Sequence, residues 1–461
     1  MKYSVIIPSY NKALSLMLTL TAFETQTYSL DQFEVVVVDD GSADDTLERL
    51  SRYRPPYQLV PVTLEETAGR SAARNRGVEA ASGDYLIFCD PDYLVTPDFV
   101  KTHDTYHQLH RNAVVSGVPI LFIKAYPHLY PDFSGEEKVA ASEVLQASGL
   151  WNNDYWQAPD LIEIVTREDI LGQTGQLEKV VAPWEPIKGN YREFPTTDVA
   201  PWLMAVTRNL SLSKRLFEEV GGFNENFQKH GLEDWELGYR LHLRGCTFVS
   251  IEEVVGYHQE HPSFHRSEDS QGENLRIIYQ NHGYADPEIS LFAILPPSEG
   301  MEGYKNTLRI LKSWRSSKNA SERAAARQVR RTLAHGARLF HLQPDAPEYG
   351  ALKNGLKPAL MAATQIYTQP DAPHKQEQIK AILTQACQSL WPDSVKPTSS
   401  RRRRKRSIRK GALRKKGART WVRSSIGKAA AHARSKAKRR SARSLHVTLR
   451  GRRRQRRRSR L

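Results

Sequence analysis

Cysteines, long apolar runs and an N-terminal leader pattern are scarce or missing in this sequence of 461 residues. The three cysteines, Cys89, Cys246 and Cys387, lie far apart and show no CxxC spacing. This argues against a disulfide framework and against a cysteine-rich zinc site. No stretch approaches the ~18 consecutive apolar residues of a membrane-spanning helix, and the N-terminus lacks the pattern of a signal peptide. We therefore expect a cytoplasmic protein of a reducing compartment.

Acidic residues are absent from the end of the chain. Residues 401–461 hold 28 of the 67 lysines and arginines and no Asp or Glu, so residues 1–400 carry 39 basic against 51 acidic side chains. The net charge of +16 therefore combines an acidic body with a basic tail. Such dense like charge predicts a disordered tail that binds by charge, not by sequence. Its partner stays open: an anionic membrane surface at the inner face of the membrane, another polyanion, or the acidic body itself.

Short β-branched runs alternate with helical patterns in the first part of the chain. Strands are expected at residues 5–7, 35–38, 56–64 and 85–88, with helices at 14–22, around 47–50, and from 68 to a C-cap at Gly83. This βαβ rhythm predicts a doubly wound α/β domain with a parallel sheet. Ligands of such sheets bind at the carboxyl ends of the strands.

The expected organisation has three parts. Residues 125–195 lack a clean period and are interpreted as a partly helical insertion or lid. The proposed parts are an α/β domain at 1–265 (nucleotide-binding half 1–110, acceptor-side half 196–265), a helical region at 266–395, and the disordered basic tail at 396–461.

Two carboxylates flank a proline where the fourth predicted strand ends. Pro91 disfavours the helical region for Asp90, so Asp90 and Asp92 can converge on one point just past the strand. A hard divalent cation, Mg²⁺ or Mn²⁺, would relieve their repulsion. The alternative is an Asp-Pro-Asp turn with a local side-chain cap.

Asp39 and Asp40 form a second acidic pair, at the end of the second predicted strand. An acidic side chain at such a point can accept hydrogen bonds from a base or a ribose, and a helix-capping turn is the competing interpretation. Tyr10, after the first strand, offers an aromatic face at the same edge of the sheet, suited to a nucleobase. Arg70, Arg74 and Arg76 lie on or beside the following Ala-rich segment, and one of them can reach the base or the phosphates.

Four motifs in register carry a family resemblance. Pro8-Ser9-Tyr10-Asn11, Asp39-Asp40-Gly41-Ser42, Ala73-Arg74-Asn75 and Asp90-Pro91-Asp92 resemble family 2 glycosyltransferases of the GT-A fold, and residues 220–245 are similar to the acceptor-side segment of that family. The resemblance covers about residues 3–265. It implies a GT-A-type, doubly wound nucleotide-diphospho-sugar transferase fold.

The resemblance also implies roles for individual residues. The nucleobase would be bound by Asp40 with Pro8, Tyr10 and Arg74, Asp90 would lie near the ribose or metal, Asp92 and His258 would bind the metal, Glu233 would contact substrate, and Asp234 would be the catalytic base. For the acids of this last segment, an amphipathic helix start is the alternative, and we accept it for Glu236, which can pair with Arg240. His261 is a weaker metal candidate than His258.

These expectations combine into a function. The implied enzyme is a metal-dependent, inverting transferase that uses Mn²⁺ or Mg²⁺ and moves a sugar from a nucleoside diphosphate, with UDP favoured, to a glycan or another hydroxyl acceptor. The QxxRW motif of processive synthases is missing from the sequence, which favours a non-processive enzyme. Two alternatives remain: a sugar nucleotidyltransferase, and a polyanion-binding protein with an inactive GT-A body.

Overall fold

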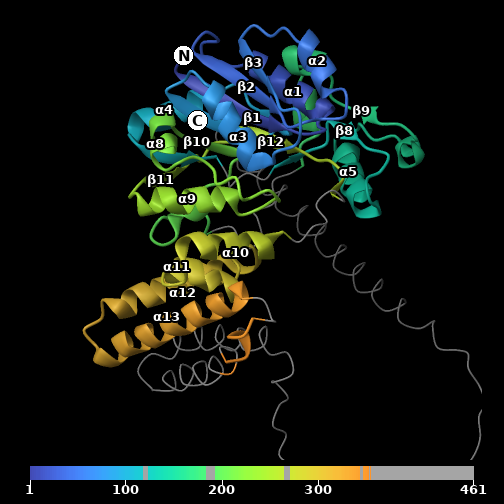
Figure 1. Cartoon of the computed structure of the whole chain (residues 1–461). Helices are drawn as coiled ribbons and strands as arrows, with labels where there is room; N and C mark the ends of the chain where they lie inside the picture. The colour runs from blue at the N-terminus through green and yellow to red at the C-terminus, as the bar shows by residue number, and fades with distance from the viewer. Residues whose placement is uncertain (118–122, 183–192, 264–269, 343–345, 352–353, 355–461) are drawn as a thin grey trace, which may run out of the picture. The chain divides into compact units, whose positions relative to one another are not determined.

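A seven-stranded mixed sheet forms the centre of the first half of the protein in the computed structural model (Figure 1), which describes residues 1–117, 123–182, 193–263, 270–342, 346–351 and 354. Its strand order is β11-β6-β10-β4-β1-β2-β3. The strands are β1 (Tyr3–Ser9), β2 (Phe33–Asp39), β3 (Gln58–Thr63), β4 (Tyr85–Cys89), β6 (Ala113–Ser116), β10 (Asn209–Ser213) and β11 (Thr247–Ser250). Strands β1 to β4 are parallel, and β10 is antiparallel to β4 and β6. The predicted doubly wound α/β fold is confirmed.

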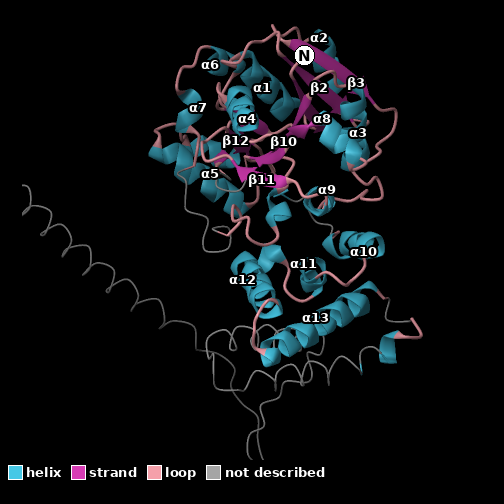
Figure 2. Ribbon diagram, turned by 90° about the vertical axis from the view of Figure 1, so that its left-hand side faces the viewer, coloured by secondary structure: helices cyan, strands magenta, loops and turns pink. Residues whose placement is uncertain are grey.

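The apolar runs are continuous because both faces of the sheet are buried. In β2, Val35 and Val37 pack into one hydrophobic cluster, while Val36 and Val38 pack into the other. Helices cover the two faces (Figure 2): α1 (Ala13–Glu24), α2 (Thr46–Arg52) and α4 (Phe99–Leu109) on the first, and α3 (Arg70–Ala80), α8 (Lys214–Glu219) and α9 (Glu233–Leu243) on the second. Strand ends and helix starts therefore meet at one edge of the sheet.

The predicted C-cap at Gly83 is wrong. Helix α3 ends at Ala80, and its C-cap Ala81 has an extended backbone. The reason for a glycine at position 83 is space, because a Cβ atom there would lie 2.7 Å from the backbone nitrogen of Ser4. Ser213 caps α8, since its side chain accepts a hydrogen bond from the backbone N–H of Leu216.

The segment predicted as an insertion is partly helical. It contains short elements: β7 (Lys124–Ala125), β8 (His128–Leu129), α5 (Gly135–Ala147), η1 (Asn153–Gln157), β9 (Ile162–Glu163), α6 (Arg167–Leu171) and α7 (Gln176–Lys179). Strand β7 joins β5 (Tyr93–Val95) and β12 (Gly256–Gln259) in a second sheet of order β5-β12-β7. This small sheet brings residues near position 258 to the end of β4.

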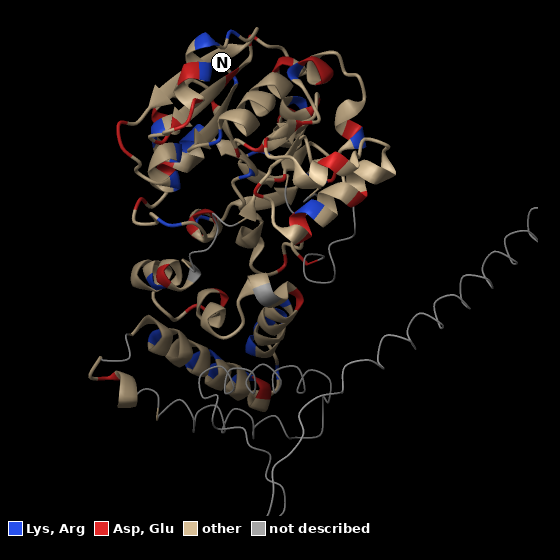
Figure 3. Cartoon of the chain, turned by 90° about the vertical axis from the view of Figure 1, so that its right-hand side faces the viewer, with Lys and Arg blue, Asp and Glu red and all other residues tan. Residues whose placement is uncertain are grey.

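Helices follow β12, as predicted. They are α10 (Gln271–His282), α11 (Pro287–Ser290), η4 (Leu291–Ala293), α12 (Pro297–Arg315) and α13 (Ala320–His341). Their apolar residues belong to the same buried cluster as η2 (Pro201–Met204) and α9. Basic side chains recur along α13 (Figure 3), whose polar face includes the exposed Arg327, Arg331 and Arg338. The predicted helices at 355–395 and the predicted tail lie outside the described residues. Within the described part, no helix meets the length and apolarity that a membrane span requires.

Two buried histidines behind the sheet predict acid sensitivity. His103 and His107 of α4 both lie 2.7 Å from the hydroxyl oxygen of Ser211. Burial, with their mutual charge repulsion at His103, lowers the pKa of His103 to about 3 and that of His107 to about 4, from an ordinary 6.5. Because the unfolded chain then binds more protons than the folded one, the free energy of unfolding should fall as the pH drops from about 6.5 towards 4.

Urea unfolding at pH 5 to 8 measures this dependence. His107→Gln should flatten it, because the amide can keep a bond to Ser211 without titrating. The matched control is His110→Gln at the exposed end of α4, which should leave the dependence unchanged. An equal flattening in both variants would contradict the assignment to the buried pair.

Candidate active site

The small sheet places a histidine beside the second acid of the Asp-Pro-Asp motif. Asp92 directly precedes β5, and β12 pairs antiparallel with β5 so that His258 lies opposite Tyr93. The backbone N–H of Gln259 donates to the carbonyl oxygen of Asp92 at 2.8 Å. His258 lies within β12. This pairing fixes the distance between Asp92 and His258.

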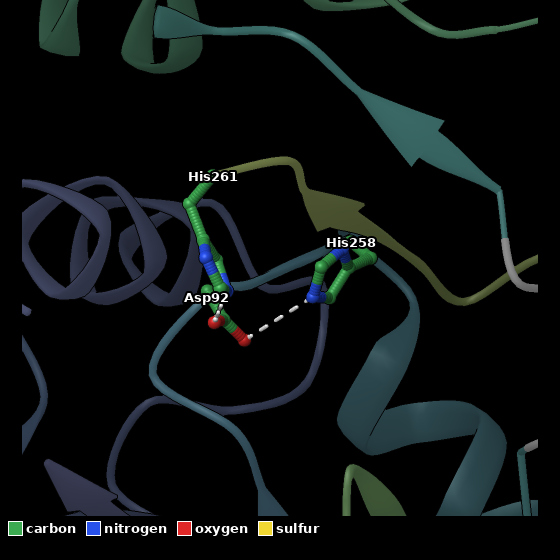
Figure 4. Close-up of side chains that lie close together, drawn as sticks. All are labelled: Asp92, His258 and His261. Carbon is green, nitrogen blue, oxygen red and sulfur yellow. Dashed lines mark ion pairs between the residues drawn. The ribbon is translucent and has the colours of Figure 1, made fainter. Parts of the chain in front are cut away.

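Asp92, His258 and His261 form a cluster with three ligand atoms within 4.8 Å of one another. Figure 4 shows both imidazoles turned towards the carboxylate. The Nε2 atom of His261 lies 3.1 Å from one oxygen of Asp92, and Nε2 of His258 lies 3.8 Å from the other. Lys12 Nζ is 3.5 Å from the same carboxylate. The sequence interpretation ranked His258 above His261, yet the structure brings both to Asp92.

The chemistry of these three side chains fits a divalent cation. Burial, followed by the charge of Arg208, lowers the pKa of His258 and favours the neutral ring that binds metals. Its Nδ1 lies 2.8 Å from Glu260, an outer carboxylate that orients the ring and leaves Nε2 free to face Asp92. Burial opposes ionisation of Asp92, but the hydrogen bond from His261 and the nearby positive charges outweigh it and lower the pKa. A carboxylate with two imidazoles is a donor set for Mn²⁺ or a similar ion.

Arg74 connects Asp90, the first acid of the Asp-Pro-Asp motif, to helix α9, which begins at Glu233. Arg74 is buried, with only 2% of the residue exposed. One nitrogen donates to Glu233 at 3.1 Å, and another lies 3.7 Å from Asp90. Arg208 lies 3.6 Å from the second oxygen of Asp90. The structure therefore joins Asp90, Arg74 and Glu233 in one charged group, although 159 residues separate Arg74 from Glu233.

Asp234 is the second residue of α9, and the pKa of its carboxyl group is raised above the ordinary value. Burial and then the charge of Glu233 raise its pKa to about 7, while Arg74 acts in the opposite direction. Its carboxylate accepts a hydrogen bond from the backbone N–H of Trp235 at 2.8 Å. A carboxyl group with a pKa near neutrality suits a residue that exchanges a proton. Glu236 instead pairs with Arg240 at 2.8 Å, as the helix-start interpretation predicted.

Three of the predicted nucleobase residues, Pro8, Tyr10 and Asp40, lie at the ends of β1 and β2, whereas Arg74 lies on α3. Asp40 is 6% exposed and accepts hydrogen bonds from the backbone N–H groups of Ala68 and Gly69 at 2.7 and 3.1 Å. It therefore anchors the loop before α3. Tyr10 is 50% exposed, and Pro8 at the end of β1 is partly exposed. The side chain of Tyr10 is therefore open to a ligand, while that of Asp40 is mostly engaged.

Sequence reasoning missed three side chains of this group: Lys12, Arg208 and Glu260. Lys12 directly follows the Ser9-Tyr10-Asn11 segment, so the motif itself was a signal for it, whereas Arg208 and Glu260 become neighbours only through strand pairing. A pocket of about 630 Å³ lies elsewhere, between η2, α9, α11, α12 and α13. None of the predicted site residues lines it.

Comparison with protein families gives two matches. The family described as "Glycosyl transferase family 2" matches residues 4–141, which contain Asp40, Arg74, Asp90 and Asp92. The family described as "N-terminal domain of galactosyltransferase" matches residues 203–263, which contain Asp234 and His258. The two matched segments together supply every predicted site residue.

Individual proteins are similar to the same part of the chain. The uncharacterized glycosyltransferase YfnE of Bacillus subtilis (strain 168) is 29% identical over 64% of this chain and 75% of its own length. Validoxylamine A glucosyltransferase of Streptomyces hygroscopicus subsp. jinggangensis (strain 5008) is 32% identical over 57% of each, and chondroitin synthase of Escherichia coli is 29% identical over 59% of this chain. The chain spans just over half the length of the glucosyltransferase and 37% of the length of the chondroitin synthase.

Among solved structures, that of S. aureus TarS 1–349 has a TM-score of 0.42 and 17% identity, covering 84% of this chain and 92% of that one. The order of the motifs, the mixed sheet and the two family matches all indicate a glycosyltransferase. The matched part of the chain, residues 4–263, is a glycosyltransferase family 2 domain with a GT-A-type fold.

Proposed function

We propose that this glycosyltransferase is metal-dependent, inverting and non-processive, and that it moves a sugar from a UDP-linked donor to a hydroxyl group of a glycan or a similar acceptor. The observation that carries the proposal is the cluster of Asp92, His258 and His261 at the sheet edge where Arg74 and Asp90 also lie. Metal-binding and charged donor-binding groups thus gather beside the segment that contains Asp234.

Asp92, His258 and His261 would hold a divalent cation, Mn²⁺ or Mg²⁺. The two imidazoles favour Mn²⁺, because Mg²⁺ prefers oxygen ligands and retains its waters. When bound, the ion supplies positive charge that stabilises the departing nucleoside diphosphate. Lys12, 3.5 Å from Asp92, adds a fixed positive charge beside the same position.

The donor nucleoside would lie over the ends of β1 and β2. The exposed ring of Tyr10 offers a face for stacking, beside Pro8. The carboxylate of Asp40 is fixed by the loop before α3 and is oriented before the base arrives. Asp90, between Arg74 and Arg208, has its charge balanced and can accept a hydrogen bond from a ribose hydroxyl.

Asp234 would remove the proton from the acceptor hydroxyl. A hydroxyl becomes an effective nucleophile when a carboxylate within hydrogen-bond reach accepts its proton. One base on the face opposite the leaving group gives a single displacement and inversion at the sugar carbon. The neighbouring Glu233 is held by Arg74 and orders the start of α9.

The product of turnover tests the proposal against its alternatives. Incubation with a panel of nucleotide sugars and Mn²⁺ should release free nucleoside diphosphate, with UDP sugars fastest. A sugar nucleotidyltransferase would instead release or consume pyrophosphate. Deletion of residues 396–461 should leave this release intact and abolish binding to anionic vesicles or heparin, because the tail contributes charge alone. Turnover that disappears with the tail would contradict this division of roles.

A further inference from the structure

Helix α9, which carries Asp234, begins from an irregular turn. Gly231 and Leu232 both have left-handed backbones, with φ angles of 104° and 68°. A leucine in this conformation costs about 1 kcal/mol or more relative to its relaxed state. The turn is therefore maintained by contacts outside itself. Leu232 is also the N-cap of α9 and supplies no side-chain oxygen, so the usual cap of a helix start is missing here.

Asn274 of α10 supplies such contacts. Its side chain is 2% exposed. Its amide nitrogen lies within hydrogen-bond distance of three consecutive carbonyl oxygens, those of Lys229 (3.2 Å), His230 (3.3 Å) and Gly231 (2.6 Å). The hydroxyl of Ser270 also donates to the carbonyl of His230. A buried amide that bonds one short segment in this way fixes the course of its backbone.

The same turn fixes Glu233. The backbone N–H of Gly231 donates to the carboxylate of Glu233 at 2.9 Å, and Arg74 donates to the other oxygen at 3.1 Å. A shift of the turn would therefore move Glu233 relative to Asp234. Since the charge of Glu233 contributes to the raised pKa of Asp234, such a shift changes both the position and the ionisation of the carboxylate.

Aromatic packing from the helical region supports the next residue of α9. Phe292 of η4 lies edge-on to the ring of Trp235, with centroids 5.7 Å apart, and stacks on Trp202 at 5.7 Å and 15°. The indole N–H of Trp235 donates to the carbonyl of Leu203 at 2.9 Å. Figure 1 shows α10 and α11 next to α9. The helical region thus contacts the start of α9 in two ways: through hydrogen bonds from Asn274 and Ser270, and through the ring of Phe292.

We propose that the helical region positions the catalytic machinery, with Asn274 as the positioning residue that sets the start of α9 and hence the place of the Asp234 carboxylate. This inference rests on the proposed role of Asp234. Asn274 is buried and acts through the backbone: its effect passes through the carbonyl groups of residues 229–231. The helical region to which it belongs also shares a buried cluster with α9.

The test replaces Asn274 by leucine, which has a similar shape and no hydrogen-bonding groups. In the full-length protein, kcat should fall about 10–100-fold, because a displacement of about 1 Å at a catalytic group has effects of this size. The affinity for UDP with Mn²⁺, measured by calorimetry, should stay unchanged. The midpoint of kcat against pH should move, and Asn274→Gln, which keeps the amide, should restore part of kcat and the original midpoint.

A matched control separates positioning from general loosening. Tyr284→Phe removes a 2.8 Å hydrogen bond to His341 that lies wholly within the helical region. It should lower the melting temperature without changing kcat or the pH midpoint. If Asn274→Leu does not fold, Asn274→Ser, which keeps one donor but cannot reach three carbonyls, replaces it in the comparison.

The outcomes distinguish this inference from the proposed function. A folded Asn274→Leu enzyme with unchanged kcat and pH midpoint would overturn the positioning role, and so would an equal loss in Tyr284→Phe. Asp234→Asn is measured beside them. If Asp234→Asn keeps normal turnover, the proposed function fails first; if it is inactive while Asn274→Leu is normal, the positioning inference alone is lost.

Discussion

Asp234→Asn is expected to lower the turnover number by about 10²–10⁴-fold, the range that a general base contributes. Asparagine preserves the shape of the side chain and its hydrogen bond from the backbone of Trp235, but it cannot accept a proton. Binding of UDP and Mn²⁺ should persist, because Asp92, His258 and His261 remain intact. Steady-state kinetics with a soluble acceptor, combined with calorimetric titration of UDP, measures both quantities.

The pH dependence provides a second signature of Asp234. The base must be deprotonated to act, so kcat should rise with pH through about 7, the raised pKa of this group. Glu233 is the charge that raises this pKa after burial, and Arg74 acts against it. Glu233→Gln should therefore lower the pKa of Asp234 and move the rising part of the profile to lower pH. A shift to higher pH would contradict the assignment.

Loss of turnover in Asp234→Asn should not be a result of unfolding. The pKa of Asp234 in the folded protein exceeds its ordinary 3.8, so the folded state binds more protons between about pH 4 and 7. The contribution of this group to the free energy of unfolding thus falls as the pH rises through that window. At pH 8 the asparagine variant should be as stable as the native protein or more so. Glu219→Gln on α8, which pairs with Arg244 near the other end of α9, is the control and should keep full turnover.

The sheet and its motifs were predictable because their signals are local. Runs such as 35–38 are apolar on both faces, so they can be strands only in a sheet covered on both sides. Asp39-Asp40 and Asp90-Pro91-Asp92 follow such runs directly, and parallel topology brings them to one edge. The helix start at Glu233 was also predictable from the sequence, since Glu236 and Arg240 have the i,i+4 spacing of a helical ion pair.

Other features of the site depend on distant contacts. Strand β5 has only three residues, and its pairing with β12, which carries His258 and precedes His261 and Glu260, has no local signature. Likewise, Gly83 looked like a helix cap because the approach of Ser4 is invisible in the sequence. An aromatic residue such as Trp202 can either stack a sugar or pack in the core, and the structure shows Trp202 fully buried against Phe292. Aromatic residues alone could not separate the two roles.

Asp92→Asn is expected to weaken Mn²⁺ binding strongly and to abolish turnover at moderate metal concentrations. The variant removes the charged ligand of the cluster and leaves His258, His261 and Lys12 around a neutral amide. The loss of metal affinity should exceed the about 10–100-fold expected for an outer partner, which Glu260→Gln measures in the same experiment. Donor binding in the presence of Mn²⁺ should weaken in parallel, because the diphosphate needs the positive charge.

Titration of Mn²⁺ by calorimetry and by its electron paramagnetic resonance signal measures this directly, without reference to activity. Asp132→Asn is the matched control: Asp132 is an exposed acid in the inserted segment, so the variant removes one charge without altering the cluster. Unchanged Mn²⁺ affinity in Asp92→Asn would exclude the cluster as the metal site. The expected Mn²⁺ affinity is lowest in Asp92→Asn, intermediate in Glu260→Gln and native in Asp132→Asn. This order would tie metal binding to the pairing of β5 with β12, because that pairing brings Asp92 and His258 together.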